Sequence, residues 1–370
     1  MPIVTKLWVT QQDHDDRDNS GTHPIEVRQI PTEQAIAQAA EMLSEGGLIA
    51  FPTETVYGLG ASALDAHALT RVFEAKGRPQ DNPLIAHISD LQQIGQIAQV
   101  PNTIAQHLME AFWPGPLSIL LPVLSNVPKI LTAGLDYVAV RMPDHPLALA
   151  LIAKAGMPIA APSANVSGKP SPTTALHVVG DLAGRIDGIL DGGSCEVGIE
   201  STVIEIVEDT IVILRPGKIT RQDLLPYAKA VLFDPYLKQG IEAHTAMTPR
   251  APGQKYRHYA PQGQLNVFFG ESVHNVQSMM QSALIQAKQV GKKTAVLTLD
   301  AHVFTHADWQ QQWGDEKAET LMQQLYGALR TCDDLRSEVI IAQGPPDDEQ
   351  HHALINRLLK ASGGNFITVS

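Results

Sequence analysis

Two short polar segments hold the residues of this chain that are best suited to chemistry. Lys76-Gly77-Arg78-Pro79 places two cations two residues apart, and Ser163-Ala164-Asn165 places a hydroxyl and a carboxamide two residues apart after an apolar run. An arginine can bind two phosphate oxygens, while a lysine acts as a point charge. The two segments together predict a site for a phosphate group beside a small polar substrate. Taken alone, the two cations would also suit the carbonyl groups at the end of a helix.

Three further polar side chains lie in or next to apolar stretches that are expected to form strands. His87 and Arg141 each sit within such a stretch, and Arg215 follows an apolar hairpin. A single histidine in such a place is more often a core residue than a ligand. A buried arginine needs an anion, because an unpaired buried charge is strongly unfavourable. Arg141 is therefore expected to meet a carboxylate from the protein or from a ligand.

The sequence has no recognised pattern for covalent or zinc-dependent catalysis. Gly-x-Ser-x-Gly, His-Glu-x-x-His and the Walker A spacing are absent, and no Gly-x-Gly-x-x-Gly follows a predicted strand. A site of cations, hydroxyls and amides suits reactions that depend on positioning and charge stabilisation. Phosphoryl and nucleotidyl transfer are reactions of this kind.

Composition limits the possible classes of protein. The 370 residues are 44% hydrophobic and 18% charged, with a net charge of -12, which suits a folded protein of two domains. Between Glu41 and Thr220 there are 10 Lys/Arg against 18 Asp/Glu, which disfavours a broad nucleic-acid surface. The distant Cys195 and Cys332 indicate neither a disulfide framework nor a cysteine metal site. Without a signal peptide or a membrane-spanning run, a cytoplasmic location and no membrane contact are expected.

Strands and helices alternate from the first residues to about residue 215, which predicts an α/β domain with a mixed sheet over residues 1–236. The glycines of Val56-Tyr57-Gly58-Leu59-Gly60 follow a predicted strand and are expected to let the backbone approach another group closely. The expected strands are Ile3–Val9, Leu48–Phe51, Leu84–Ile88, Leu117–Val123, Val138–Met142, Ile159–Ala161 and the hairpin Val203–Val207 with Ile211–Leu214. The expected helices are Thr32–Glu45, Ala66–Ala75, Thr103–Ala111 and Pro146–Lys154.

The rest of the chain is predicted to be a linker, residues 237–263, and a small domain, residues 264–370. The linker is rich in proline but also carries Tyr256, His258 and Tyr259, which suits a segment that touches something. Three β–α units then predict a parallel sheet. Their expected ranges are Leu265–Phe269, Val273–Val290, Thr294–Leu299, Glu316–Arg330, Val339–Ala342 and Asp348–Lys360.

The order and spacing of several motifs resemble the YrdC-type L-threonylcarbamoyladenylate synthases, in their long two-domain form. The resemblance covers nearly the whole chain, and Gln254 departs from the methionine expected there. It is carried by Phe51-Pro52-Thr53-Glu54-Thr55-Val56-Tyr57-Gly58-Leu59, Lys76-Gly77-Arg78-Pro79 with Asn82-Pro83-Leu84, Trp113-Pro114-Gly115, Ala161-Pro162-Ser163-Ala164-Asn165, Gly198-Ile199-Glu200-Ser201-Thr202-Val203, Leu214-Arg215-Pro216-Gly217 and Tyr259-Ala260-Pro261.

The resemblance implies a YrdC-like mixed twisted sheet with helices and an open cleft, followed by a smaller Rossmann-like domain. It also implies a reaction in which L-threonine, bicarbonate or CO2, and ATP, with Mg2+, give threonylcarbamoyl-AMP and pyrophosphate. A partner enzyme, a threonylcarbamoyl transferase, would then modify the adenosine next to the tRNA anticodon. Stable binding of nucleic acid by this chain is not expected.

Residue by residue, the resemblance assigns two sets of contacts and two catalytic cations. Lys76 and Arg78 would offset the charge that develops on the phosphates, and Tyr256 or Tyr259 in the linker would close over the nucleotide. No metal-binding residue of the protein is implied. The threonine contacts would be Thr55, His87, Arg141, Ala161 and Ser201. The nucleotide contacts would be Arg78, Asn82, Tyr137, Ser163, Asn165, Ser171, Arg215 and Tyr259.

Two alternatives come from other classes. A non-catalytic RNA-binding or ribosome-assembly module would need a broad basic face, which the acidic balance disfavours. Carbamoyl-adenylate chemistry of the hydrogenase-maturation type would bring zinc-finger and acylphosphatase-like segments, and the sequence shows neither.

Overall fold

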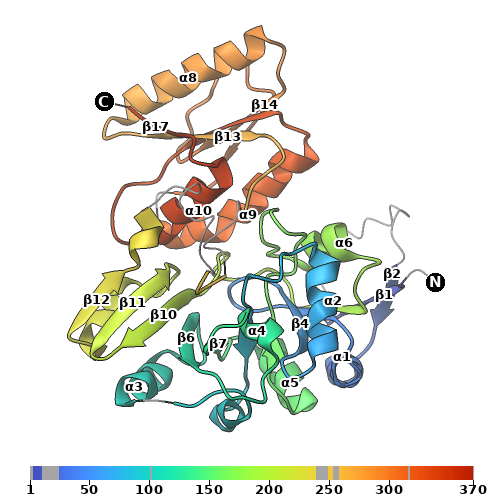
Figure 1. Cartoon of the computed structure of the whole chain (residues 1–370). Helices are drawn as coiled ribbons and strands as arrows, with labels where there is room; N and C mark the ends of the chain where they lie inside the picture. The colour runs from blue at the N-terminus through green and yellow to red at the C-terminus, as the bar shows by residue number, and fades with distance from the viewer. Residues whose placement is uncertain are drawn as a thin grey trace.

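The computed structural model describes residues 3–10, 25–100, 102–238, 249–252, 258–315 and 317–369, which form two sheets (Figure 1). The elements of the first part are β1 (Thr5–Val9), β2 (Ile25–Gln29), α1 (Thr32–Ser44), β3 (Ile49–Phe51), β4 (Gly58–Ser62), α2 (Ala66–Lys76), β5 (Ile85–His87), η1 (Leu91–Gln96), α3 (Thr103–Phe112), β6 (Leu117–Pro122), α4 (Lys129–Thr132), β7 (Tyr137–Arg141), α5 (Pro146–Ala155), β8 (Ile159–Ala160), α6 (Ala175–Leu182), β9 (Gly188–Asp191), β10 (Thr202–Val207), β11 (Thr210–Arg215), α7 (Arg221–Leu224), η2 (Leu225–Tyr227), β12 (Ala230–Phe233) and η3 (Pro235–Lys238). Those of the second part are β13 (Gln264–Phe269), α8 (Val273–Gln289), β14 (Thr294–Thr298), β15 (Trp309–Gln312), α9 (Ala318–Asp334), β16 (Val339–Gln343), α10 (His352–Ser362) and β17 (Phe366–Thr368).

The first sheet has twelve strands in the order β12-β11-β10-β6-β7-β5-β8-β4-β3-β9-β1-β2 and mixes parallel with antiparallel pairs. Helices α1 and α5 pack their apolar side chains on one face, and α2, α3 and α6 contribute to the core on the other. Both faces of the central strands are covered, which explains why strands such as β3, β5 and β7 are short and mostly apolar. The mixed α/β sheet predicted from the sequence is confirmed.

Two neighbouring strands bring the predicted site residues to one edge of this sheet. Strands β5 and β7 run parallel, and His87 at the end of β5 lies opposite Arg141 at the end of β7. Strand β8 pairs antiparallel with the other side of β5 and places Ile159 beside His87. The chain that follows β8 bridges to β4 through Ser163 and Gly58. Side chains distant in sequence therefore meet where the parallel strands end.

The glycine-rich segment after β3 is itself a strand, β4, and not a loop. A Cβ atom at Gly60 would lie 2.8 Å from the ring of Phe51 and 2.9 Å from the side chain of Ile159. The close approach expected from these glycines is therefore met at Gly60 by neighbouring side chains within the sheet.

The second sheet is wholly parallel, in the order β15-β14-β16-β13-β17. It contains the three predicted β–α units and two short strands, β15 and β17, that the sequence did not reveal. Helix α8 covers one face, and α9 and α10 cover the face that looks toward the first sheet (Figure 1). The smaller parallel-sheet domain is therefore confirmed.

One apolar core runs across the boundary between the two parts. Val56, Val197 and Ile199 of the first part pack with Tyr259 and with the buried side chains of α9 and α10. At Gly198 a Cβ atom would lie 2.4 Å from the backbone of α9, so only glycine lets this loop reach the helix. The loop before β10 is thereby held against the second part.

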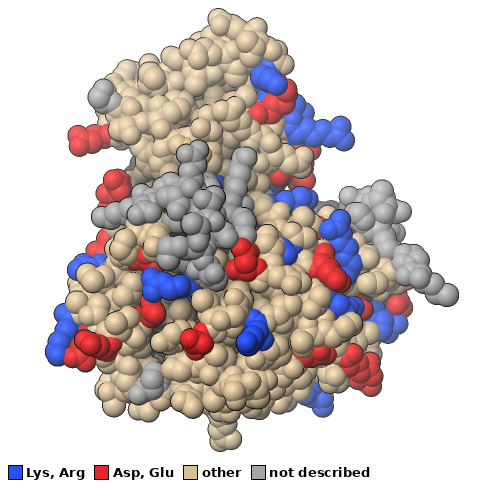
Figure 2. Space-filling view, viewed as in Figure 1, with Lys and Arg blue, Asp and Glu red and all other residues tan. Residues whose placement is uncertain are grey.

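One face of the molecule shows how its charged side chains are distributed. On the face shown in Figure 2, Lys and Arg are interspersed with Asp and Glu. In the ranges that the structure describes, no helix is both long and apolar enough to cross a membrane.

Candidate active site

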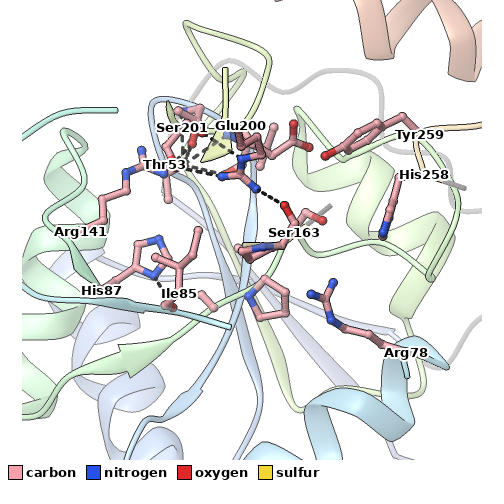
Figure 3. Close-up of a pocket in the computed structure, with 17 residues that line it drawn as sticks. Thr53, Arg78, Ile85, His87, Arg141, Ser163, Glu200, Ser201, His258 and Tyr259 are labelled. Atoms are coloured by element: carbon pink, nitrogen blue, oxygen red, sulfur yellow. Dashed lines mark hydrogen bonds between the residues drawn. The ribbon is translucent and has the colours of Figure 1, made fainter. Parts of the chain in front are cut away.

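A cavity lies where β5, β7 and the chain after β8 meet (Figure 3). All five residues predicted to contact threonine line it, together with four of those predicted to contact the nucleotide, Arg78, Ser163, Arg215 and Tyr259. The full lining is Thr53, Thr55, Val56, Gly58, Arg78, Ile85, His87, Arg141, Ala161, Pro162, Ser163, Glu200, Ser201, Arg215, Pro252, His258 and Tyr259.

Arg141 forms the cationic end of the cavity and is buried. Its Nη2 lies 2.5 Å from Oε1 of Glu54, which is also buried, and the contact is an ion pair. Its Nη1 donates a hydrogen bond to Thr55 Oγ1 at 3.0 Å, and its Nε donates to the carbonyl of Gly115 at 3.2 Å. The anion expected beside Arg141 is thus supplied by the protein, and Glu54 was not selected from the sequence.

His87 lies beside Arg141 with a defined tautomer. Its Nδ1 lies 3.2 Å from the carbonyl oxygen of Ile85, and because a carbonyl only accepts, Nδ1 carries the proton. Burial, and then the charge of Arg141, lower the pKa of His87 to about 3. At neutral pH His87 is therefore uncharged, with a lone pair on Nε2.

This pKa predicts how activity depends on pH. We expect His87→Gln to raise the threonine KM without moving the acidic limb of the kcat/KM profile between pH 5.5 and 8. The histidine does not titrate there, because its pKa lies well below its ordinary value. An acidic limb near pH 6.5 that disappears in the variant would show that His87 acts as a protonated or proton-transferring group.

Ser201 and Arg215 form another part of the cavity wall. Arg215 donates from Nε to the carbonyl of Ser201 and from Nη2 to Ser201 Oγ, both at 3.0 Å. Its Nη1 donates to the carbonyl of Pro252 at 3.3 Å, and Ser201 Oγ also lies 2.8 Å from Ser118 Oγ. Arg215 therefore ties the described part of the linker to the cavity wall.

Lys76 lies elsewhere than the sequence suggested. Its Nζ donates to the carbonyl oxygens of Ser163 and Asn165, both at 2.5 Å, and its side chain is 1% exposed and does not line the cavity. Burial, and then the charge of Arg78, lower its pKa. In this geometry Lys76 fixes the loop that carries Ser163 instead of reaching a phosphate, whereas Arg78 lines the cavity.

A Lys76→Met variant separates these two roles. Loss of the two bonds leaves two buried carbonyl groups unsatisfied, at about 1–3 kcal/mol each, so we expect a lower Tm and a raised ATP KM. The matched control is Lys154→Met, at an exposed position of α5, which should change neither. An unchanged Tm with a large fall in kcat would instead support direct contact with the phosphates.

Four other predicted nucleotide contacts do not line the cavity. Asn165 is buried and donates from Nδ2 to the carbonyls of Val166 and Lys169, so its side chain holds the loop. Ser171 donates to Glu200 Oε1 at 2.6 Å. Asn82 is fully buried, and its side-chain amide has no hydrogen-bond partner among the described residues.

Tyr137 is the least compatible with a nucleotide contact. It begins β7, is 44% exposed, and pairs with Pro122 at the opposite end of the strand from Arg141. Four residues of strand span about 13 Å. Only the carboxyl ends of β5 and β7 reach the cavity, so Tyr137 does not line it.

The second part of the chain supplies the outer support of the cavity. Glu200 lines the cavity and accepts hydrogen bonds from Arg357 Nε at 2.7 Å and from the hydroxyl of Tyr326 at 3.0 Å. Tyr259 stacks on Tyr326 with ring centroids 5.4 Å apart, and the guanidinium of Arg357 lies 5.3 Å from the centre of the Tyr259 ring. Tyr256 and Gln254 lie outside the described residues.

Burial would raise the pKa of Glu200, but the charges of Arg357 and Arg215, with hydrogen bonds from Ser171 and Arg357, lower it to about 2. Glu200 is therefore a carboxylate held in place by groups from both parts of the chain. Neither Tyr326 nor Arg357 was selected from the sequence. The only signal was that Arg357 is a cation within an apolar helical pattern.

The fold and the cavity define an α/β protein with a polar site lined by arginines, hydroxyl groups and an uncharged histidine. Residues 41–217 match the family described as telomere recombination, and residues 219–363 match the family described as threonylcarbamoyl-AMP synthase, C-terminal domain. The chain belongs to the threonylcarbamoyl-AMP synthase family.

Relatives match over almost their full length. The threonylcarbamoyl-AMP synthase of Bacillus subtilis strain 168 is 46% identical over 337 residues, which are 90% of this chain and 94% of that protein. The Pyrococcus abyssi enzyme of the same name is 44% identical over 345 residues, 93% of this chain and 99% of that protein. The crystal structure of P. abyssi Sua5 complexed with L-threonine has a TM-score of 0.86 and 43% identity, covering 93% of this chain and 98% of that one.

Proposed function

We propose that the protein makes L-threonylcarbamoyl-AMP and pyrophosphate from L-threonine, bicarbonate or CO2, and ATP. One observation carries the proposal. A single cavity brings together every residue assigned to threonine with Arg78, Ser163, Arg215 and Tyr259 from the nucleotide set.

The threonine half lies between β5 and β7. Arg141 binds the threonine carboxylate there, while Glu54 holds the guanidinium from behind and Thr55 accepts from it. The lone pair on His87 Nε2 accepts a hydrogen bond from the hydroxyl or the amine of threonine. Arg141 thus offers a positive charge to the carboxylate of threonine. His87 offers an uncharged acceptor to its hydroxyl or amine.

The nucleotide half lies between the loop at Ser163 and the linker residues that line the cavity, Pro252, His258 and Tyr259. Arg78 lines this side and places its charge near the phosphates, with Mg2+ entering as part of the ATP complex. Described residues contain no group of three or more His, Cys, Asp or Glu that could hold a metal, so the phosphates themselves would carry the ion.

The reaction has two steps. The threonine amine adds to CO2 and releases a proton, which gives a carbamate. A carbamate oxygen then attacks the α-phosphorus of ATP. The bond between the α-phosphorus and the oxygen that bridges to the β-phosphorus breaks, and pyrophosphate leaves with the electron pair. The role of the chain is to align the carbamate with the α-phosphorus and to offset charge on the phosphates.

Water must be excluded, because both the carbamate and the mixed anhydride hydrolyse. Pro252, His258 and Tyr259 line the outer side of the cavity and belong to the linker. Ala251 packs on the first sheet, and Tyr259 packs on the second part. The packing of the described ends of the linker supports a role of the linker in closing the site.

The direct test is incubation of the protein with ATP, threonine and bicarbonate, followed by mass analysis for threonylcarbamoyl-AMP. Pyrophosphate should form only when all three substrates are present. ATP–pyrophosphate exchange that proceeds without threonine and bicarbonate would contradict the proposed order of chemistry. A partner transferase would then pass the group to tRNA, and a cytoplasmic location suits that role.

The rival assignment, an RNA-binding module without catalysis, is not favoured. Charges of both signs alternate on the face shown in Figure 2, and the net charge is -12. A gel-shift titration with salt would distinguish the two, since phosphate contacts give a steep salt dependence. We expect weak tRNA binding together with turnover of ATP.

A further inference from the structure

The small parallel sheet contains a topological switch point between its neighbouring strands β13 and β16. From β13 the chain passes through α8 to β14, beyond β16, whereas from β16 it passes through α10 to β17, beyond β13. Figure 1 shows α8 and α10 on opposite faces of the sheet. The loops after the two strands therefore diverge, and open α/β sheets hold ligands in the crevice left by such a divergence.

A cavity of about 820 Å³ occupies this position and shares no lining residue with the active site. Its size lies within the roughly 300–1,000 Å³ typical of small-molecule sites. We name it the C-terminal crevice. Its lining includes Phe269, Glu271, Val273, Pro345, Asp347 and Phe366.

The walls of the C-terminal crevice favour a flat, apolar ring. The rings of Phe269 and Phe366 lie 4.7 Å apart, centroid to centroid, and are inclined at 45°. Val273, the first residue of α8, leaves 44% of its surface exposed at the same cavity. An aromatic ligand would bury this apolar surface and stack against the phenylalanines.

The charges of the C-terminal crevice disfavour a phosphate. Glu271 and Asp347 line it, and none of its lining residues is a lysine, an arginine or a histidine. Gly270 and Gly344 follow the two strands, but neither has the positive φ of a backbone nest for anions. Gly344 is needed for packing instead, because a Cβ atom there would lie 2.4 Å from the Phe269 ring.

We propose that the C-terminal crevice binds a nucleoside that carries no phosphate. The base lies against Phe269 and Phe366, and Glu271 and Asp347 accept hydrogen bonds from the sugar hydroxyls. A carboxylate at the end of a parallel strand binds ribose in this way, whereas a phosphate would be repelled by both carboxylates. The site is separate from the one proposed for synthesis and does not depend on that reaction.

The test uses the full chain and adenosine as the probe, with ATP present to occupy the active site. Calorimetry should show adenosine binding that Val273→Trp weakens at least tenfold, because the indole fills the mouth of the crevice. Val290→Trp is the matched control: it substitutes the same residue type, 73% exposed, at the other end of α8. This control should bind adenosine as the wild type does.

A second variant tests the charge argument without filling the crevice. Asp347→Asn should weaken adenosine binding and improve the binding of AMP, which should bind the wild type at least tenfold more weakly than adenosine. No adenosine binding beside ATP, equal binding by the two tryptophan variants, or AMP as tight as adenosine would each overturn the inference. Threonylcarbamoyl-AMP synthesis should be unchanged in Val273→Trp. If the wild type makes no product while adenosine binding still depends on Val273, the proposed function fails and this inference stands.

Discussion

Replacing Arg357 by alanine is expected to lower both stability and kcat, although Arg357 lies outside the sheet that builds the cavity. The side chain is fully buried and donates to Glu200 at 2.7 Å and to the carbonyl of Pro216 at 3.0 Å. Removing one partner of a buried ion pair costs about 3–5 kcal/mol, because the other charge stays buried. Since Glu200 lines the cavity, its displacement should also disturb the adjoining Ser201.

Thermal unfolding and steady-state kinetics measure these effects. Glu200→Gln in the Arg357→Ala background should recover part of the lost stability, because it removes the unpaired charge, but it should not recover kcat. Breaking the exposed pair of Lys292 and Glu338 with Lys292→Ala is the matched control and should leave Tm unchanged. If Arg357→Ala lowered Tm while kcat stayed at the wild-type value, Arg357 would be structural only and not a positioning residue.

The pKa of Glu200 determines in which direction its contribution to stability changes with pH. Because its folded pKa, about 2, is lower than its ordinary value of 4.5, its contribution to wild-type stability is complete above about pH 4.5. That contribution is lost as the pH falls toward 2. In Arg357→Ala the difference in Tm from the wild type should shrink between pH 7.5 and pH 4.5, because protonation removes the unpaired charge.

Arg141→Met should raise the threonine KM at least tenfold and change the ATP KM by less than threefold. A hydrogen bond to a charged group is worth about 1.5–3 kcal/mol, and each 1.4 kcal/mol is a factor of ten. The substitution also leaves Glu54 buried without its partner, so Tm should fall. Initial rates over a range of each substrate, with thermal unfolding, measure both effects.

A second substitution separates binding from folding at this site. Glu54→Gln in the Arg141→Met background should restore stability, since it removes the isolated charge, while the threonine KM stays high. If the double variant recovered the wild-type KM, Arg141 would act only by neutralising Glu54. An unchanged threonine KM in Arg141→Met alone would contradict the assignment of the carboxylate.

Strong local patterns predicted most of the fold. The long apolar periodicity of α8 and α9, and the apolar strands ended by His87 and Arg141, gave elements close to those observed. The elements that were missed are mostly short strands such as β2 and β15, which carry little apolar signal and gain their stability from pairing. Strand β4 was missed because its glycines, which serve close packing, are typical of loops elsewhere.

The site was predicted unevenly for a physical reason. Arg141 could be marked from its apolar surroundings as a buried cation that needs an anion, whereas the role of His87 followed only from the family resemblance. The direction of a long flexible side chain could not, so Lys76 was expected at a phosphate and is found on two carbonyls. No local sequence pattern identifies contacts between residues distant in the chain, such as that of Arg357 with Glu200.

Because the two parts of the chain share one core, the active site can be completed only after the second part has been synthesised. Glu200 and Arg357 are separated by 157 residues. At about 5–20 residues per second, the partner of this carboxylate is made on the order of 10–30 s after the carboxylate itself. Until then the apolar side chains of Val197 and Ile199 lack the surface that covers them. The nascent first domain should therefore be a transient client for chaperones, and it should gain a finished active site only when α10 docks.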